Sequence, residues 1–141
     1  MLALELRNDL AELSRLYAAL TAFAGEHGLP AEDLWALDLA LEEVVVNVMK
    51  YAYDDARGHT VAVRLTVAGG EVIAEVEDDG RPFNPLTRPD PDFDRALGEM
   101  PIGGLGIHLV RQLMDGLEYR RQADRNLLVL RKRLTCLGRE V

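Results

Sequence analysis

Two segments in the middle of the chain alternate apolar and polar residues, and they constrain the fold more than any other feature. They read TVAVRLTVA at 60–68 and EVIAEVED at 71–78. A period of two is typical of strands that bury one face. Only Gly69 and Gly70 separate the two segments, and paired glycines suit hairpin turns that need positive φ. The sequence therefore predicts a β-hairpin over 60–78.

Further helix and strand patterns lie on both sides of this hairpin. Asn8 is expected to cap a first helix, which Gly25 and Gly28 end. Pro30 is expected in the first turn of a second helix, which runs to about Tyr53. In chain order we expect a strand at 2–6, helices at about 10–25 and 30–53, and the hairpin at 60–78. An aperiodic loop at 80–102 follows, then a helix at 103–116 and two strands joined by a turn, at 117–122 and 126–134. This order indicates an α+β protein, a two-layer α/β sandwich with a mixed or antiparallel sheet and helices on one face.

Composition is that of an ordinary globular protein. Of the 141 residues, 48% are hydrophobic and 28% charged, which suffices for one buried core. We find no apolar run of the roughly 18 residues that a membrane helix needs, and no basic region typical of a signal peptide. The single cysteine, Cys136, excludes an internal disulfide, and His27, His59 and His108 lack metal-ligand spacing. We therefore expect a soluble, cytoplasmic, single-domain protein over 1–141.

The charge is negative and unevenly distributed. The net charge of −8 disfavours direct nucleic-acid binding, which depends on neutralising phosphates. Acidic residues dominate 71–99, and basic residues dominate 111–141. Two interpretations stay open: a solvated surface, or a C-terminal segment that meets an anionic ligand or an acidic partner.

The expected second helix carries an unusual polar pair. Its apolar face should meet the sheet and comprises Leu34, Leu37, Leu41, Val44, Val45 and Val48. Glu43 and Asn47 are four residues apart, so they stack on nearly the opposite face, which Leu39 and Val46 flank. A carboxylate and an amide in such surroundings are costly without a partner. The pair is either a functional site or a solvated pair on a surface helix.

Two further motifs combine glycine with hydrogen-bonding groups. Asp78-Asp79-Gly80 is either a common turn, or a carboxylate that accepts from an exocyclic amine beside a glycine that lets the backbone approach a flat ring. The glycine-rich start of the next helix serves tight packing or a hinge, or it presents backbone N–H groups to phosphate oxygens. Its residues are Gly103, Gly104, Leu105 and Gly106.

In order and context, these three motifs resemble the Bergerat-fold ATPases, which include the ATPase domains of type II topoisomerases and histidine kinases. The three boxes of that fold read here Glu43-Val44-Val45-Val46-Asn47, Asp78-Asp79-Gly80 and Gly104-Leu105-Gly106. The resemblance covers about residues 8–133. Within the superfamily, LDLALEEVVVNVMKYAY, VEDDGRPFNP and IGGLGIHLVRQLMD resemble the stand-alone anti-sigma factor serine kinases. Histidine kinases and topoisomerases need further segments that a chain of this length does not accommodate.

The resemblance implies an ATP site in which each motif has a role. Asn47 would ligate Mg²⁺ on the triphosphate, and Glu43 would act as general base toward the attacking hydroxyl. Asp78 would accept from the adenine amine, and Gly80 would shape the floor under the ring. Residues of about 80–102 would form the ATP lid. The backbone that would wrap the phosphates belongs to Gly103, Gly104, Leu105 and Gly106.

Several positions depart from the superfamily pattern. Pro82 stands where many members have a second glycine. The last strands lack the threonine that is usual near the adenine, and Asn126 could take its place. Lys50 lies near the Glu43 face and could meet a phosphate or pair with Glu43. The candidates for a lid arginine are Arg81, Arg88 and Arg95.

By this resemblance we expect an ATP- and Mg²⁺-dependent protein serine/threonine kinase that acts as an anti-sigma factor. It would hold a sigma factor and phosphorylate a serine on a small anti-anti-sigma protein, with no nucleic-acid or membrane partner. A homodimer through the first strand and helix is also expected. The alternative is a non-catalytic switch in which bound ATP or ADP controls partner binding. A third interpretation is an interaction domain without nucleotide, in which all three motifs are turns and caps.

Overall fold

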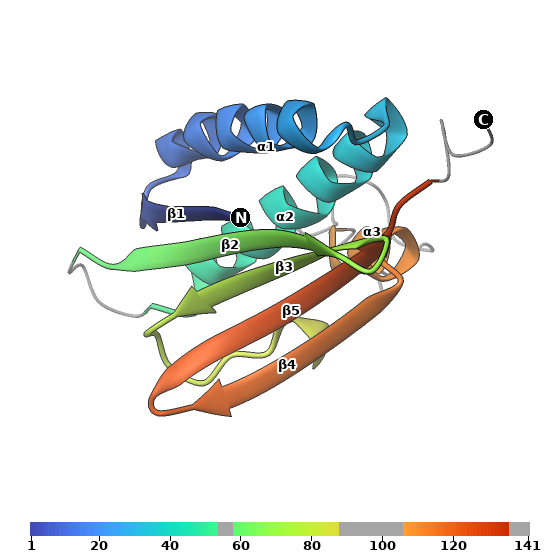
Figure 1. Ribbon diagram of the computed structural model, residues 1–141. Helices are drawn as coiled ribbons and strands as arrows, with labels where there is room; N and C mark the ends of the chain where they lie inside the picture. The colour runs from blue at the N-terminus through green and yellow to red at the C-terminus, as the bar shows by residue number, and fades with distance from the viewer. Residues whose placement is uncertain (54–57, 88–105, 136–141) are drawn as a thin grey trace, which may run out of the picture.

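The computed structural model describes residues 1–53, 58–87 and 106–135, and within them five strands form one sheet in the order β1-β2-β3-β5-β4 (Figure 1). Every pairing in the sheet is antiparallel, so the second of the two expected arrangements is present and the sheet is not mixed. The strands are β1 (Leu2–Arg7), β2 (Thr60–Ala68), β3 (Glu71–Asp78), β4 (Gly116–Gln122) and β5 (Arg125–Arg133). Cys136 lies outside the described residues.

Among the described residues, three α-helices cover one face of this sheet (Figure 1). They are α1 (Leu13–His27), α2 (Ala31–Tyr51) and α3 (Gly106–Leu113), and two short 3-10 helices are η1 (Leu10–Glu12) and η2 (Pro85–Thr87). The predicted α+β two-layer architecture is confirmed. No helix in the described part of the chain has both the length and the apolar character needed to cross a membrane.

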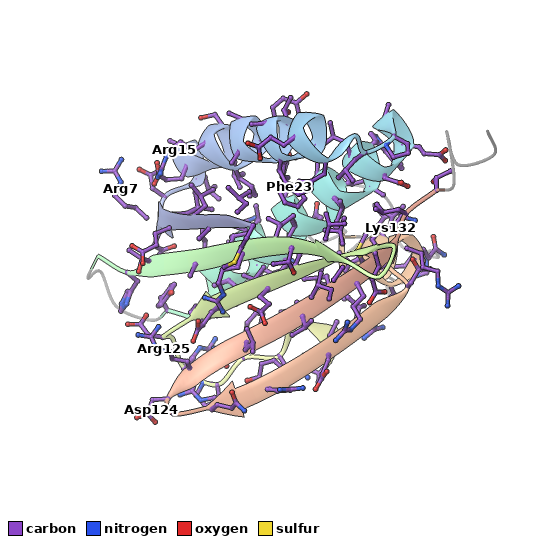
Figure 2. The ribbon with its side chains drawn as sticks, viewed as in Figure 1. Arg7, Arg15, Phe23, Asp124, Arg125 and Lys132 are labelled. Atoms are coloured by element: carbon purple, nitrogen blue, oxygen red, sulfur yellow. The ribbon has the colours of Figure 1, made fainter. Side chains whose placement is uncertain are left out.

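The core lies between the helical layer and the inner face of the sheet. Alternate residues of the two central strands are fully or almost fully buried, namely Val61, Val63, Leu65, Val72, Ala74 and Val76. Phe23 of α1 enters the same core from the helical side (Figure 2). Burial of each such side chain contributes about 1.5–3 kcal/mol, so this sandwich interface is the main source of stability.

Both hairpins turn through residues with positive φ. Gly69 and Gly70 have φ of 60° and 79°, as the paired glycines predict. The second hairpin turns at Ala123 and Asp124, with φ of 50° and 64°, and Arg125 already belongs to β5 (Figure 2). This second turn uses the left-handed region without glycine, which costs some strain at Ala123.

Some predicted helix boundaries need correction. The N-terminal cap is Asp9 rather than Asn8, because the chain first forms η1 and the Asp9 carboxylate accepts from Ala11 N at 2.9 Å. The second helix ends at Tyr51 rather than Tyr53, and Pro30 is its N-cap residue. Instead of continuing the helix, the carbonyl of the C-cap residue Ala52 accepts a hydrogen bond from the backbone after β3.

Ion pairs between neighbouring strands line the outer face of the sheet. Arg64 of β2 pairs with Glu75 at 2.9 Å and with Glu77 at 3.0 Å, and Arg131 of β5 pairs with Glu71 of β3 at 3.1 Å. Acids of 71–77 thus offset bases on adjacent strands. This pairing favours the solvated-surface interpretation of the uneven charge for the strand residues involved.

Candidate functional site

Asp78 is the last residue of β3, and the strand alternation directs its side chain to the covered face of the sheet. It follows the buried residues Val72, Ala74 and Val76 on that face, and only 1% of it is exposed. Asp79 is exposed instead, and its Oδ1 lies 3.3 Å from His59 Nδ1. The two adjacent aspartates therefore have different surroundings, and only Asp78 is a buried carboxylate.

Both described hydrogen bonds to Asp78 end on one of its two oxygens. Oδ1 accepts from Gly80 N at 2.9 Å and from Asn126 Nδ2 at 2.9 Å. Among the described residues, none donates to Oδ2. Burial raises the pKa of Asp78, whereas the hydrogen bonds from Asn126 and Gly80 lower it and offset part of this rise. Oδ2 is therefore available to accept a donor from a ligand.

Gly80 is required by a close approach between two elements. A Cβ atom at this position would lie 2.3 Å from the carbonyl oxygen of Ala52 and 2.8 Å from its Cβ. Arg81 N donates to the same Ala52 oxygen at 2.8 Å. The chain after β3 thus packs directly on the C-terminal end of α2. This contact explains the glycine by itself, and a role under an adenine ring stays a prediction.

Asn47 is a buried amide with an unused acceptor. Its Nδ2 donates to the Glu43 carbonyl at 2.7 Å, whereas its Oδ1 is buried and accepts no hydrogen bond from any described residue. We expected this side chain on the face opposite the core, yet only 1% of it is exposed. The packing of α3 against α2 gives the helix a second covered side. An unpaired buried acceptor costs about 1–3 kcal/mol. The structure thus keeps a polar atom that its own contacts do not satisfy.

Glu43 lies one helical turn before Asn47 and is partly buried. No described residue donates a hydrogen bond to its carboxylate. Lys50 is exposed and forms no ion pair with Glu43, although both belong to the described part of α2, so the pairing considered from the sequence is absent. The Glu43 carboxylate is therefore not held by its own helix.

The first two motifs lie at the same end of α2. Asn47 precedes Ala52 by five residues, about 7.5 Å along a helix axis, and Ala52 contacts Gly80. Figure 1 shows this end of α2 beside the carboxyl end of β3. For the third motif, the described part of α3 begins at Gly106, and Gly103, Gly104 and Leu105 lie outside the described residues. The helix ends at Leu113, and Gly116, expected to close it, is the first residue of β4.

The described start of the expected lid is anchored to the fold. Phe83 N donates to Asn126 Oδ1 at 3.1 Å, and the Phe83 ring lies 5.9 Å from the ring of Tyr51. Of the candidate lid arginines, Arg81 donates through Nε to the Tyr51 carbonyl at 2.8 Å. The other two candidates, Arg88 and Arg95, lie outside the described residues, as does all of the expected lid after Thr87.

Tyr53 supplies an aromatic group beside the same carboxylate. Its ring stacks on His59 with centroids 4.1 Å apart. Burial first, and then the negative charges of Asp78 and Asp79, raise the pKa of the Tyr53 hydroxyl. From the sequence, Tyr53 was expected only as the approximate end of the second helix, and its place beside the carboxylate comes from the structure, in which the helix ends at Tyr51.

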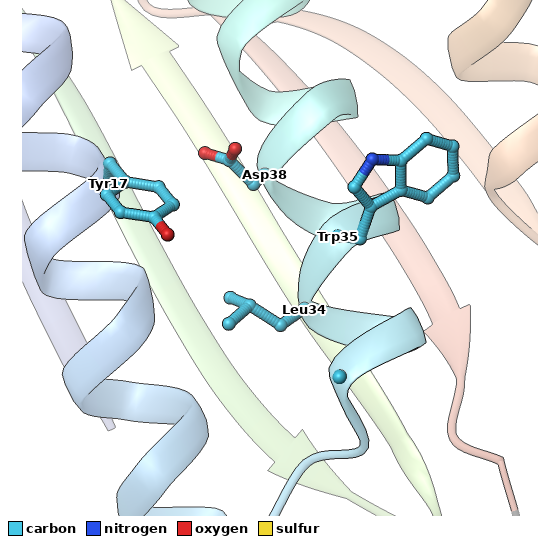
Figure 3. Close-up of a pocket in the computed structure, with 5 residues that line it drawn as sticks. Tyr17, Leu34, Trp35 and Asp38 are labelled. Carbon is cyan, nitrogen blue, oxygen red and sulfur yellow. The ribbon is translucent and has the colours of Figure 1, made fainter.

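A separate cavity lies between α1 and the N-terminal half of α2, away from Asn47 (Figure 3). Its volume is about 310 Å³, and it is lined by Tyr17, Ala31, Leu34, Trp35 and Asp38. Leu34, expected to face the sheet, is only partly buried here. One turn beyond Asp38, burial and that neighbouring carboxyl raise the pKa of Glu42 to about 7. Figure 3 shows the Trp35 ring directed away from Tyr17, so the two rings do not enclose a ligand together.

The chain is similar in sequence to a known protein family and to named protein kinases. A family model described as histidine kinase-like ATPase domain matches residues 6–132. The chain is 31% identical over 113 residues to the serine/threonine-protein kinase BtrW of Bordetella bronchiseptica, covering 74% of this chain and 78% of that protein. It is 28% identical over 121 residues to the serine-protein kinase RsbW of Listeria monocytogenes, covering 83% and 76%.

A solved structure supports the same fold. The RsbU and RsbW domains of a Mycobacterium tuberculosis protein match with a TM-score of 0.64 at 20% identity, over 95% of this chain and 33% of that one. At this identity the likeness shows the fold alone. The family that the three sequence motifs predict is confirmed separately, by the family model and by the relatives named above.

Proposed function

Because the chain belongs to the histidine kinase-like ATPase family, and its relatives include proteins named serine-protein kinases, we propose that it is an ATP- and Mg²⁺-dependent protein serine/threonine kinase and an anti-sigma factor. The observation that carries the proposal is the pair of unused acceptors at one end of α2, Asn47 Oδ1 and Asp78 Oδ2. The adenine amine would donate to Asp78, and the triphosphate would extend toward Asn47 and the start of α3.

The donor atom at Asn47 fits a magnesium ion. Mg²⁺ prefers oxygen ligands and takes one or two protein ligands beside phosphate oxygens and water. The Asn47 Oδ1 is such an oxygen, and it is buried without a partner. When bound, the ion would neutralise charge on the phosphates during transfer. The Nδ2 bond to the Glu43 carbonyl would keep Oδ1 directed away from the helix backbone.

Glu43 would act as the general base. In the proposed reaction the serine oxygen of the partner attacks the γ-phosphorus, the bond to the β–γ bridging oxygen breaks, and ADP leaves. The serine proton passes to the Glu43 carboxylate, which lies one turn from Asn47. Most of the rate would come from positioning these groups, since phosphoryl transfer needs little further chemistry from the protein.

The protein substrate would be a small anti-anti-sigma factor. A phosphoserine adds about −1.5 to −2 charges, and this chain has a net charge of −8. Phosphorylation would thus weaken the complex by repulsion and leave the chain to hold its sigma factor. We propose further that the protein is cytoplasmic and forms a single domain over 1–141. We also propose a homodimer through β1 and α1, because β1 is an edge strand.

A non-catalytic nucleotide switch is the second candidate. The observation that favours it is the Glu43 carboxylate, which no hydrogen bond from a described residue orients. In this case ATP or ADP would still bind at Asp78 and Asn47. Bound nucleotide would then change the affinity for a partner protein, and no phosphate would move.

Label transfer from radioactive ATP distinguishes the two candidates. The protein is mixed with Mg²⁺, ATP labelled at the γ-phosphate, and an anti-anti-sigma protein encoded beside it. The kinase proposal predicts a labelled serine and a loss of about 100-fold or more in Glu43→Gln, with ATP binding kept. Glu26→Gln, an exposed acid on α1, is the matched control. Tight ATP binding without any transfer by the parent would favour the switch.

A further inference from the structure

Asn126 faces Asp78 across two neighbouring strands. The two residues are register partners in the β3–β5 pairing, and both side chains lie on the covered face of the sheet. Only 3% of Asn126 is exposed. A buried amide at this position must find several hydrogen-bond partners to be tolerated.

Every polar atom of the Asn126 side chain has partners. Nδ2 donates to Asp78 Oδ1 at 2.9 Å and to the Arg81 carbonyl at 2.8 Å. Oδ1 accepts from Phe83 N at 3.1 Å, from the Tyr119 hydroxyl and, more weakly, from Arg121 Nη1 at 3.3 Å. The side chain thus connects β3, β4 and the segment 81–83 at one point.

Backbone partners fix which way the amide faces. The Arg81 carbonyl can only accept and the Phe83 N–H can only donate, so Nδ2 must lie on the Arg81 side. A reversed amide would place its oxygen against two other oxygens. Asn126 therefore presents a donor, and not an acceptor, to the Asp78 carboxylate.

We propose that Asn126 is a positioning residue that holds the Asp78 carboxylate in the orientation that selects adenine, and that it ties this carboxylate to the first residues of the loop after β3. The inference rests on the proposed nucleotide site. Together with Gly80 N, the Asn126 donor occupies Asp78 Oδ1. The oxygen left for a base is then Oδ2, at a fixed place relative to the sheet.

The same amide links base reading to the loop. Two of its bonds go to the backbone of Arg81 and Phe83, which begin the expected lid. Arg121 adds a bond to the Gly80 carbonyl at 2.8 Å. A shift of the Asp78 side chain must therefore disturb the start of the loop, and a shift of the loop must disturb Asp78.

Asn126→Asp tests the orientation with the smallest change of shape. The new carboxylate keeps the acceptor for Phe83 N and places a second oxygen against Asp78 Oδ1. At low pH the two carboxyls share a proton, which restores the donor, and at higher pH they repel each other. Other charged or titratable groups around Asp78 are Tyr53, Asp79, Arg81, Tyr119 and Arg121, and all are unchanged in both proteins.

Binding of ATP and GTP is measured by calorimetry between about pH 5.5 and 8 for the parent and for Asn126→Asp. We expect the preference of the variant for ATP over GTP to fall about tenfold or more as pH rises, with the parent changing much less. Thr21→Asp, which adds one carboxylate on the exposed side of α1, should follow the parent. An unchanged ATP preference and pH profile in a folded Asn126→Asp would overturn the inference.

A measurement without nucleotide separates this inference from the proposed function. The Asp78 carboxyl carbon is titrated by NMR in the ligand-free parent and in Asn126→Leu, with Asp78→Asn to assign the signal. Loss of the donor should raise the apparent pKa of Asp78, because the Asn126 hydrogen bond is one of the contacts that lower it. A parent that binds no ATP, together with this shift, would contradict the proposed function and keep the positioning role. No shift in a folded Asn126→Leu would contradict the positioning role.

Discussion

Two buried asparagines in this protein have opposite hydrogen-bonding states. Asn126 is 3% exposed and Asn47 is 1% exposed. Both polar atoms of the Asn126 amide are paired within the fold, whereas the Asn47 Oδ1 has no partner in the part of the chain that the structure describes. Native contacts alone account for Asn126, because its hydrogen bonds within the fold offset the cost of burying the amide. They do not account for the Asn47 oxygen, for which we propose a bound metal ion as the missing partner.

Asp78 combines the two hydrogen-bonding states in one carboxylate. One of its oxygens is held by Gly80 and Asn126, and no described residue donates to the other. One end of the candidate site is thus a rigid scaffold, and the other end is left incomplete. This difference leads to separate predictions for stability and for activity at the two asparagines.

The largest expected effect is on catalysis at Asn47. Asn47→Ala should reduce phosphate transfer about 100-fold or more, because it removes the proposed ligand oxygen. The same change should leave the free energy of unfolding nearly unchanged, since it also removes an unpaired buried acceptor. Initial rates of label transfer and urea denaturation check the two parts. A large loss of stability with normal transfer would make Asn47 a structural residue.

The next effect concerns the scaffold at Gly80. Gly80→Ala should destabilise the fold by about 2–4 kcal/mol, because the new Cβ meets the Ala52 backbone oxygen and the chain must move. Gly58→Ala is a matched control, since a Cβ there has nothing within 4 Å. Urea denaturation measures both. Equal stabilities of the two variants would show that the close approach is not rigid.

A direct comparison of the two asparagines follows. Asn126→Ala should cost about 2–3 kcal/mol of unfolding free energy, because it leaves Phe83 N, the Arg81 carbonyl and one side of Asp78 without their partner. Asn47→Ala should cost much less. Chemical denaturation of both variants at the same pH gives the two free energies of unfolding to be compared. Equal losses would remove the distinction between a satisfied and an unsatisfied amide.

The smallest effect lies outside the site, at Glu42. Its pKa is raised to about 7 in the folded state by burial and by Asp38, so the folded protein binds more protons than the unfolded chain between about pH 4.5 and 7. Stability should therefore fall as pH rises through this range. Glu42→Gln should reduce this pH-dependent loss of stability and raise Tm near pH 8 by about 1–3 °C. The expected change is small because solvent screens this partly exposed group. A Tm difference independent of pH would contradict the assignment.

The sequence predicts local periodicity well and long-range partners poorly. Both strands of the central hairpin begin and end where expected, and their period of two already places Asp78 on the buried face. The burial of Asn47 does not follow from the helical angles of α2, because it depends on elements that pack on this helix from elsewhere in the chain, and α3 is one element in contact with α2. The bond from Asn126 to Asp78 joins residues 48 positions apart. It depends on the register between β3 and β5, which the sequence does not specify locally.

In the proposed function, ATP bound at Asp78 brings a metal ion to the Asn47 oxygen. Calorimetric titration of ATP, with and without Mg²⁺, into the parent and into Asn47→Ala examines this step by itself. We expect one nucleotide per chain, an affinity that Mg²⁺ raises about tenfold or more in the parent, and little Mg²⁺ effect in the variant. Absence of ATP binding by the parent, or the same Mg²⁺ effect in both proteins, would contradict it.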